Sequence, residues 1–256
     1  MFSPDRAAFQ KAAASGANLI PLAHSWPADL ETPLTTWIKV GAGRPPGVLL
    51  ESVEGGETLG RWSVIACDPL WTASARGDRL TRQWRDGTSD VHQGNPFDGL
   101  RQHLSPYRCA NLPGLPPLGQ LYGMWGYELI QWIEPTVPIH PQDDSSPPDG
   151  IWMLMDGILI FDQVKRLITA VAYGDLSGGC SVETAWQSGL ARIDDLRRRM
   201  DAPLPAVAPL QWSPNADVLP DVSSNRDRSD FEAAVDSARE HIAAGDVFQL
   251  VLSQRL

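Results

Sequence analysis

The segment from Val48 to Pro69 contains two apolar runs separated by an acidic, glycine-containing connection, VLLESVEGGETLGRWSVIACDP. Short apolar runs on either side of such a connection are typical of paired β-strands. The glycines give the turn its backbone freedom, and Asp68-Pro69 ends the second run. The pattern therefore predicts a hairpin whose second strand follows Gly60.

Two polar residues, Glu51 and Ser52, interrupt the first run where an ordinary strand would continue. A carboxylate and a hydroxyl next to an apolar wall suit a small polar ligand. Polar residues are also common where a strand runs into a turn. From the pattern alone, a ligand-binding wall and the solvated end of a hairpin both stay open.

Helices and strands are predicted on both sides of this hairpin. Capping residues followed by helical apolar spacing predict helices from Ser3-Pro4 to Ala14, over Leu34–Val40, from Asn95 to before Pro106, and from Ser181 to Arg199. Strand patterns occupy Leu19–Leu22, Trp71–Ala75, Arg79–Trp84, Gln120–Gly126, Ile151–Asp162 and Lys165–Tyr173, the last two as a hairpin. We expect an α+β fold, mainly antiparallel sheets with flanking helices.

The C-terminal part is organised differently. Proline-rich, aperiodic sequence predicts a linker over residues 201–227, after an N-terminal domain over residues 1–200. A capping box at Ser229–Glu232 predicts a helix that stops at Gly245, and Val247–Ser253 is predicted as a strand with two apolar faces. Because that strand needs partners on both faces, residues 228–256 are expected to be the truncated start of a second domain.

Composition narrows the choice of partners and compartment. Acidic residues outnumber basic ones by 31 to 21, so a general attraction to nucleic acid or to anionic membranes is not expected. The three cysteines, Cys67, Cys109 and Cys180, are far apart and not in CxxC spacing, which favours a reducing compartment such as the cytoplasm. Residues 1–20 lack the continuous apolar core of a signal peptide, and no run is long enough to span a membrane.

Local catalytic and metal motifs are missing from the sequence. The histidines form no HxxxH pattern, and there is no GxSxG elbow or phosphate-binding loop. The adjacent acids Asp143 and Asp144 lie in a proline-rich run that predicts a solvated loop rather than a metal site.

Four stretches, in order, resemble one family. LLESVEGGETLGRWSVIACDP is similar to the LLES and GRYS-type segment in the N-terminal region of anthranilate synthase component I. The stretches LYGMWGYEL (121–129), IWMLMDGILIFDQVKRLITAVAY (151–173) and AGDVFQLVLSQR (244–255) are similar to later parts of the same family. Together they identify the chain as resembling the N-terminal part of that enzyme.

The resemblance implies a function for the complete protein and a binding role for this part of it. Members of the family use Mg²⁺ and ammonia from a glutamine amidotransferase subunit, component II, to convert chorismate to anthranilate, the first step of tryptophan synthesis. By resemblance Ser52, Glu51 and Leu50 form one wall of the tryptophan feedback pocket. The family's catalytic residues and metal ligands are expected beyond Leu256, so no catalytic or metal-binding residue is assigned and the fragment is expected to be inactive. The family has Tyr where this chain has Trp62, a position that the pattern assigns to strand packing.

Two other functions stay open. One is component I of 4-amino-4-deoxychorismate synthase, which belongs to the same superfamily and serves the folate pathway. The other is a non-catalytic amino-acid-binding module, if the fragment is complete as it stands. A reading frame that continues with magnesium-binding glutamates and a histidine would support an enzyme.

Overall fold

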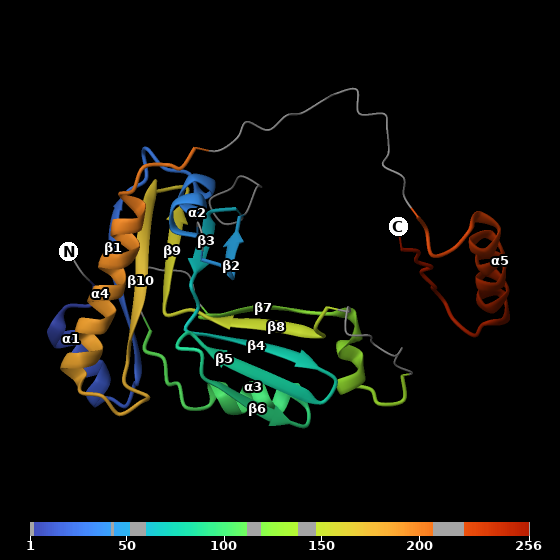
Figure 1. The fold of residues 1–256 in the computed structure, drawn as a ribbon, viewed down its shortest axis with the longest axis horizontal. Coiled ribbons are helices and arrows are strands. Elements are labelled where there is room, and N and C mark those ends of the chain that lie inside the picture. Colours follow the sequence, from blue (N-terminus) through green and yellow to red (C-terminus); the bar gives the residue numbers. More distant parts are fainter. Residues whose placement is uncertain are drawn as a thin grey trace. The chain divides into compact units, whose positions relative to one another are not determined.

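The computed structural model describes residues 3–41, 44–51, 60–111, 119–137, 147–206 and 223–255. The chain divides into two units, Met1–Ala206 and Val207–Leu256, which are described separately. Unit 1 is built from two antiparallel five-stranded sheets that lie across one another (Figure 1). The predicted α+β class is confirmed.

Sheet A has the strand order β1-β10-β9-β3-β2, and sheet B has the order β6-β5-β4-β8-β7. The strands of sheet A are β1 (Leu19–Pro27), β2 (Gly47–Leu50), β3 (Trp62–Cys67), β9 (Gly157–Asp162) and β10 (Leu167–Asp175). The strands of sheet B are β4 (Trp71–Arg76), β5 (Arg79–Trp84), β6 (Ser89–Gln93), β7 (Leu121–Trp125) and β8 (Gly150–Leu154). The helices are α1 (Arg6–Ala14), α2 (Pro33–Gly41), α3 (Pro96–Leu104), the 3₁₀-helix η1 (Tyr127–Trp132), α4 (Val182–Met200) and α5 (Arg228–Ala244).

The predicted hairpin is β2 paired with β3, in a register that places Leu50 opposite Val64 and Gly47 opposite Cys67. A Cβ on Gly47 would lie 2.6 Å from the Trp37 ring and 2.8 Å from the Ala66 carbonyl oxygen. Only glycine therefore allows α2 to approach this strand so closely.

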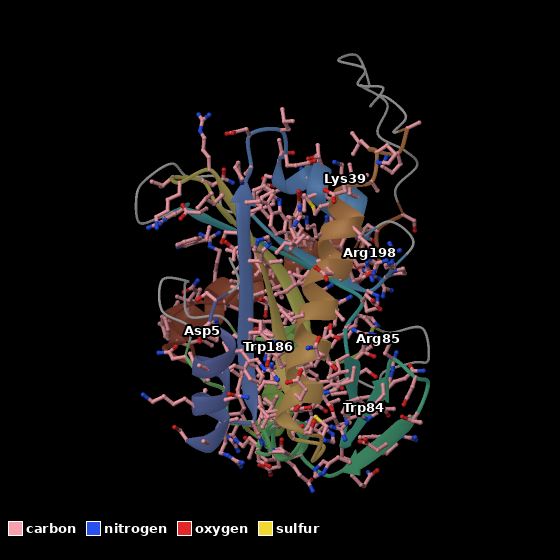
Figure 2. All side chains as sticks on the ribbon, turned by 90° about the vertical axis from the view of Figure 1, so that its left-hand side faces the viewer. Asp5, Lys39, Trp84, Arg85, Trp186 and Arg198 are labelled. Carbon is pink, nitrogen blue, oxygen red and sulfur yellow. The ribbon has the colours of Figure 1, made fainter. Side chains whose placement is uncertain are left out.

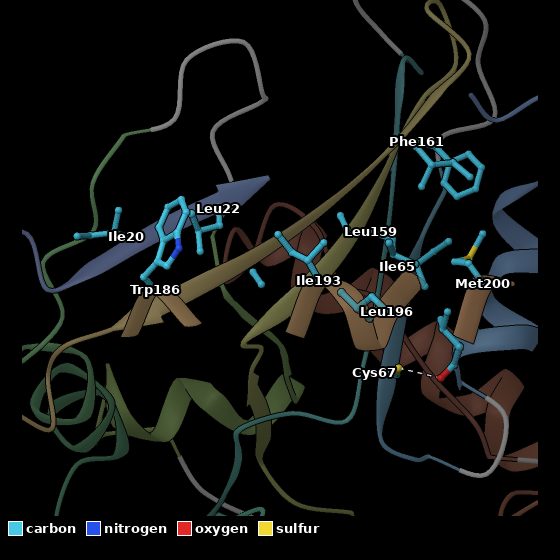
Figure 3. Close-up of a cluster of buried hydrophobic side chains, with 14 of the residues drawn as sticks. Ile20, Leu22, Ile65, Cys67, Leu159, Phe161, Trp186, Ile193, Leu196 and Met200 are labelled. Carbon is cyan, nitrogen blue, oxygen red and sulfur yellow. Dashed lines mark hydrogen bonds between the residues drawn. The ribbon is translucent and has the colours of Figure 1, made fainter. Parts of the chain in front are cut away.

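Helices α1, α2 and α4 cover one face of sheet A. The predicted apolar face of α4 is confirmed, because Trp186, Ile193 and Leu196 are buried against the sheet (Figure 3). Trp186 also meets Phe9 of α1 edge to face at 5.1 Å. Figure 2 shows α4 running along the sheet, with Arg198 near its C-terminal end. Sheet B is covered on one face by α3, which Asn95 caps as predicted.

The sequence predicted a single strand over Ile151–Asp162, and this prediction is wrong. The run begins in sheet B as β8 and continues in sheet A as β9, with Asp156 between the two strands. Asp156 pairs with Arg85 at 2.8 Å and with Arg192 at 3.0 Å, so charge pairing holds the chain where it changes sheets. The apolar pattern hid this break because both sheets bury the residues on either side of it.

The two sheets share one bent ribbon. β3 continues into β4 through Asp68, and β8 continues into β9 through Asp156. Since β3 pairs with β9 and β4 pairs with β8, these four strands form two antiparallel lengths of chain that both turn at the same place. Leu70 N donates to Leu154 O at 2.8 Å beside the bend.

Smaller differences concern helix starts and one strand. Asp5, not Ser3, caps α1, and its carboxylate accepts from Ala8 N, while Ser3 bridges to Ala23 of β1. Strand β6 was not predicted, because its sequence SDVHQ lacks apolar alternation.

In unit 2 the structure describes residues 223–255, which contain α5 and, after it, a segment without secondary structure. Asp227 rather than Ser229 caps the helix, accepting from Asp230 N, and Gly245 ends it in the left-handed region as predicted. The predicted strand Val247–Ser253 is wrong, because the structure contains no strand there. Within the described part of this unit no other strand is present to pair with it, and Phe248 and Val251 are exposed. The domain boundaries at residues 200 and 227 stay a prediction.

No helix among the described residues has the length and apolar character needed to cross a membrane.

Candidate functional site

The residues proposed to bind a ligand lie at the end of β2. Leu50 is the last residue of this strand, and Glu51 follows it. β2 forms one edge of sheet A, and the Leu50 side chain is 49% exposed. Ser52 lies outside the described residues, so its predicted role is carried by the sequence resemblance alone. The structure thus places two of the proposed residues at an accessible sheet edge.

Leu50 belongs to an apolar wall on the face of sheet A that α4 does not cover. In the ladder Leu50 is opposite Val64, and Val64 is opposite Ile160 of β9. Residues in such pairs, and those two positions away along each strand, share one face. Val48, Trp62 and Val64 are half-buried there against the cluster that includes Ile160. We call Val48, Leu50, Trp62 and Val64 the β2–β3 wall.

A fixed cation lies beside this wall. Arg61 precedes Trp62, and its guanidinium lies 4.3 Å from the Trp62 ring centroid. Arg61 Nε donates to Asp162 Oδ1 at 3.0 Å, and Nη2 donates to Asp162 Oδ2 at 2.6 Å. The hydrogen bond from Arg61 lowers the pKa of Asp162. Hydrogen bonds from the backbone N–H groups of Lys165 and Val164 lower it further. Spacing did not single out Arg61, because its partner lies about a hundred residues further along the chain.

The C-terminal end of β3, at the bend into β4, is held by a charged cluster. Asp68, in the left-handed region at φ 60°, lies within 3.3 Å of Arg85 and Arg199 and 3.5 Å of Arg192. Burial alone would lower the pKa of Arg199, but the neighbouring carboxylates of Asp195 and Asp68 outweigh this effect, so the pKa of Arg199 is raised. Cys67 beside it donates to Val40 O (Figure 3), and burial raises the pKa of its thiol. These contacts fix the strand on which the wall is built.

The half-buried residues of the β2–β3 wall offer a surface on which a small molecule can bind. The half-buried Trp62 indole and its aliphatic neighbours offer an apolar surface, the paired Arg61 guanidinium stacks on that indole, and the exposed Glu51 follows Leu50 in the chain. An amino acid with an apolar side chain and charged ends matches these features. The described ranges bring together no group of three or more His, Cys, Asp or Glu residues that could hold a metal ion. We therefore derive no step through magnesium from them.

Comparison with known proteins shows which family of proteins this chain belongs to. The family model described as chorismate binding enzyme matches residues 48–256, and the chain belongs to this family. Within it, the chain is similar to anthranilate synthase component 1 from Synechocystis, with 46% identity over 262 residues, covering 100% of this chain and 51% of that protein. The same component from Pseudomonas aeruginosa is 33% identical over 256 residues, covering 98% of this chain and 51% of the relative. The chain thus spans about half the length of the curated relatives it matches.

A solved structure shows the same fold. The crystal structure of anthranilate synthase component I from Streptococcus pneumoniae TIGR4 aligns with a TM-score of 0.55 and 24% identity, covering 88% of this chain and 46% of that chain. The resemblance that the sequence motifs indicated is confirmed. The roles of Leu50, Glu51 and Ser52 stay predictions.

Proposed function

We propose that this chain is the N-terminal, regulatory half of an anthranilate synthase component I, whose complete form converts chorismate to anthranilate. The proposal is supported by four ordered motifs and by relatives of this name that match along the whole chain. Component I of 4-amino-4-deoxychorismate synthase is the second candidate. Product analysis distinguishes them, because only the first releases fluorescent anthranilate directly.

The wall beside β2 is the proposed tryptophan site. The observation that supports this proposal is that the exposed Leu50 ends the edge strand β2, with Glu51 directly after it, beside the half-buried Trp62 and Val64. The indole of a bound tryptophan would pack on the wall, and Glu51 would attract the ammonium group. Ser52, by resemblance, would hydrogen-bond the same ligand.

Inhibition curves of the complete enzyme test this assignment. In Ser52→Phe we expect tryptophan inhibition to weaken at least about tenfold, a loss of about 1.4 kcal/mol of binding free energy, with chorismate turnover retained. Ser89→Phe, at an exposed serine of β6, is the matched control and should leave inhibition unchanged. An unchanged tryptophan response in Ser52→Phe would exclude the site.

The remaining properties of the complete enzyme follow from the same proposal. Magnesium, chorismate and the glutamine amidotransferase subunit would act at residues outside this chain, so residues 1–256 alone should release no anthranilate with either ammonia or glutamine. Magnesium-dependent fluorescence from the purified chain would contradict this. The free state of Cys67, Cys109 and Cys180 supports a reducing, cytoplasmic setting.

A further inference from the structure

At the start of β3 an arginine is held over the ring of its neighbour. The Arg61 guanidinium lies 4.3 Å from the Trp62 ring centroid, and two of its nitrogens donate to Asp162, Nε to Oδ1 at 3.0 Å and Nη2 to Oδ2 at 2.6 Å. The Arg61 and Asp162 side chains are 25% and 7% exposed. A bidentate, charge-assisted pair of this kind fixes the plane of the guanidinium as well as its position.

The carboxylate of Asp162 is in turn fixed by the backbone around it. In the ladder Asp162 lies directly opposite Trp62, so the two side chains share one face of sheet A. Its Oδ1 also accepts from Val164 N at 3.1 Å and from Lys165 N at 3.0 Å, in the turn that joins β9 to β10. A chain of contacts therefore runs from a hydrogen-bonded turn, through one carboxylate and one guanidinium, to the indole of Trp62.

The backbone of β3 does not depend on this contact. Gln163 N donates to Arg61 O at 2.9 Å, and residues 62–65 pair with β9. The other end of the strand is held by the charged cluster around Asp68. Loss of the side-chain contact between Arg61 and Asp162 should therefore free the indole and leave the strand in place.

We infer that Asp162 is a positioning residue of the proposed tryptophan site, and that it fixes the Trp62 indole through Arg61. The inference rests on the function proposed for the β2–β3 wall, and adds a residue that acts on the ligand through another side chain. Trp62 is half-buried, so only part of its ring is open to a ligand, and the contact with Arg61 determines which part. A ring that is already ordered favours binding, because no side-chain freedom is lost when the ligand arrives.

Tryptophan inhibition of the complete enzyme tests the inference, with each curve scaled to the rate of the same variant without tryptophan. Asp162→Asn keeps an oxygen for the turn but loses the charge that holds Arg61, and should raise the half-inhibiting tryptophan concentration about threefold to tenfold. Arg61→Lys keeps a charge but has no planar fork, and should act in the same direction. Asp90→Asn is the matched control, because Asp90 pairs with Arg82, which stacks on Trp84 in sheet B, and it should leave inhibition unchanged.

A variant without the ring separates positioning from a general structural role. In a protein that carries Trp62→Leu, the added change Asp162→Asn should alter the half-inhibiting concentration by less than about twofold, because both residues act through the same ring. If Asp162→Asn has its full effect in that background, Asp162 does not act through Trp62 and the inference is wrong.

The 256-residue chain allows the ring to be observed without tryptophan. Asp162→Asn should reduce the near-ultraviolet circular dichroism of the indole bands, because a ring without fixed packing loses this signal, while the far-ultraviolet spectrum is retained. In the Trp62→Leu chain the same change should cause no further loss. An unchanged near-ultraviolet spectrum in Asp162→Asn would show that Asp162 does not order the ring.

The outcomes separate this inference from the function on which it rests. If Ser52→Phe weakens tryptophan inhibition and Asp162→Asn does not, the site stands and the positioning role of Asp162 is wrong. If neither variant alters inhibition, the proposed tryptophan site is wrong and the inference fails with it.

Discussion

Arg192 of α4 places its Nε 3.0 Å from Asp156 Oδ1, so the helix that covers sheet A also holds the bend through which the chain enters sheet B. The Arg192 side chain is only 11% exposed. A largely buried cation requires a partner, because the low-dielectric surroundings penalise an uncompensated charge. Asp68 and Asp195 share this role, at 3.5 and 2.9 Å from Arg192 Nη1.

Removing the charge at the bend should destabilise unit 1. We expect Asp156→Asn to lower the free energy of unfolding by about 2 kcal/mol, because the charge-assisted hydrogen bond from Arg85 and the ion pair with Arg192 are lost. Urea denaturation measures the difference. Asp98→Asn, which removes a pair with Arg101 on the surface, is the control and should change stability by less than about 0.5 kcal/mol. Equal effects of the two variants would show that the bend does not depend on its charges.

Close packing of β7 on β8 should make Gly123 intolerant of a side chain. A Cβ there would lie 2.3 Å from Ile151 O and 2.4 Å from Trp152 Cδ1. Since the obstruction includes backbone, Gly123→Ala should cost about 1–3 kcal/mol in a denaturant titration. Gly178→Ala serves as the control, because nothing lies within 4 Å of its added Cβ. A Gly123→Ala protein as stable as the control would mean that β7 can move away from β8 at little cost.

His103 should make stability fall when the solution is acidified. Burial and the neighbouring Arg82 lower the pKa of this imidazole, while Asp90, 3.6 Å away, acts in the opposite direction. Below about pH 6.5 the unfolded chain binds the proton more readily than the folded chain, so stability present above this pH is progressively lost below it. His92 also lies close to the His103 imidazole, and repulsion between the two rings disfavours protonation of His103. The unfolding temperature should fall less between pH 7.5 and pH 6 in His103→Gln than in the wild type. Equal falls in both proteins would show that His103 does not contribute to the pH dependence of stability.

Unit 2 should reduce the solubility of the chain. Phe248, Val251 and half of the Ile242 side chain face solvent, and apolar groups exposed in this way favour association. A chain that ends at Asn225 should therefore scatter less light after concentration than residues 1–256, with the circular dichroism of the sheets retained. Equal scattering from both chains would locate the aggregating surface in unit 1.

The sequence predicted much of unit 1 because its elements carry local signals. Asn95 and Ser181 cap their helices as expected, and the two apolar runs around the glycines form the paired strands β2 and β3. What it could not reveal was the division of Ile151–Asp162 between two sheets. That division depends on Arg85 and Arg192, which are distant in sequence and reach Asp156 only in the folded chain.

The candidate site was predictable only in part, for a related reason. Glu51 and Ser52 stand out because they are polar residues in an apolar run. Val64 and Trp62 resemble ordinary strand residues, and only the register of β2 on β3 shows that they share the face of Leu50. At the other end of the chain, apolar alternation in Val247–Ser253 predicted a strand, but alternation cannot supply the neighbouring strand that a ladder requires.

The bent ribbon formed by β3–β4 and β8–β9 has a consequence for how unit 1 melts. Neither sheet can lose its central pairing without disturbing the other, because the same two lengths of chain run through both. The sheets should consequently lose amide protection together, at one common free energy, rather than as separate foldons. The edge strands β1 and β2 of sheet A and β6 and β7 of sheet B, which the ribbon does not include, are left free to open first.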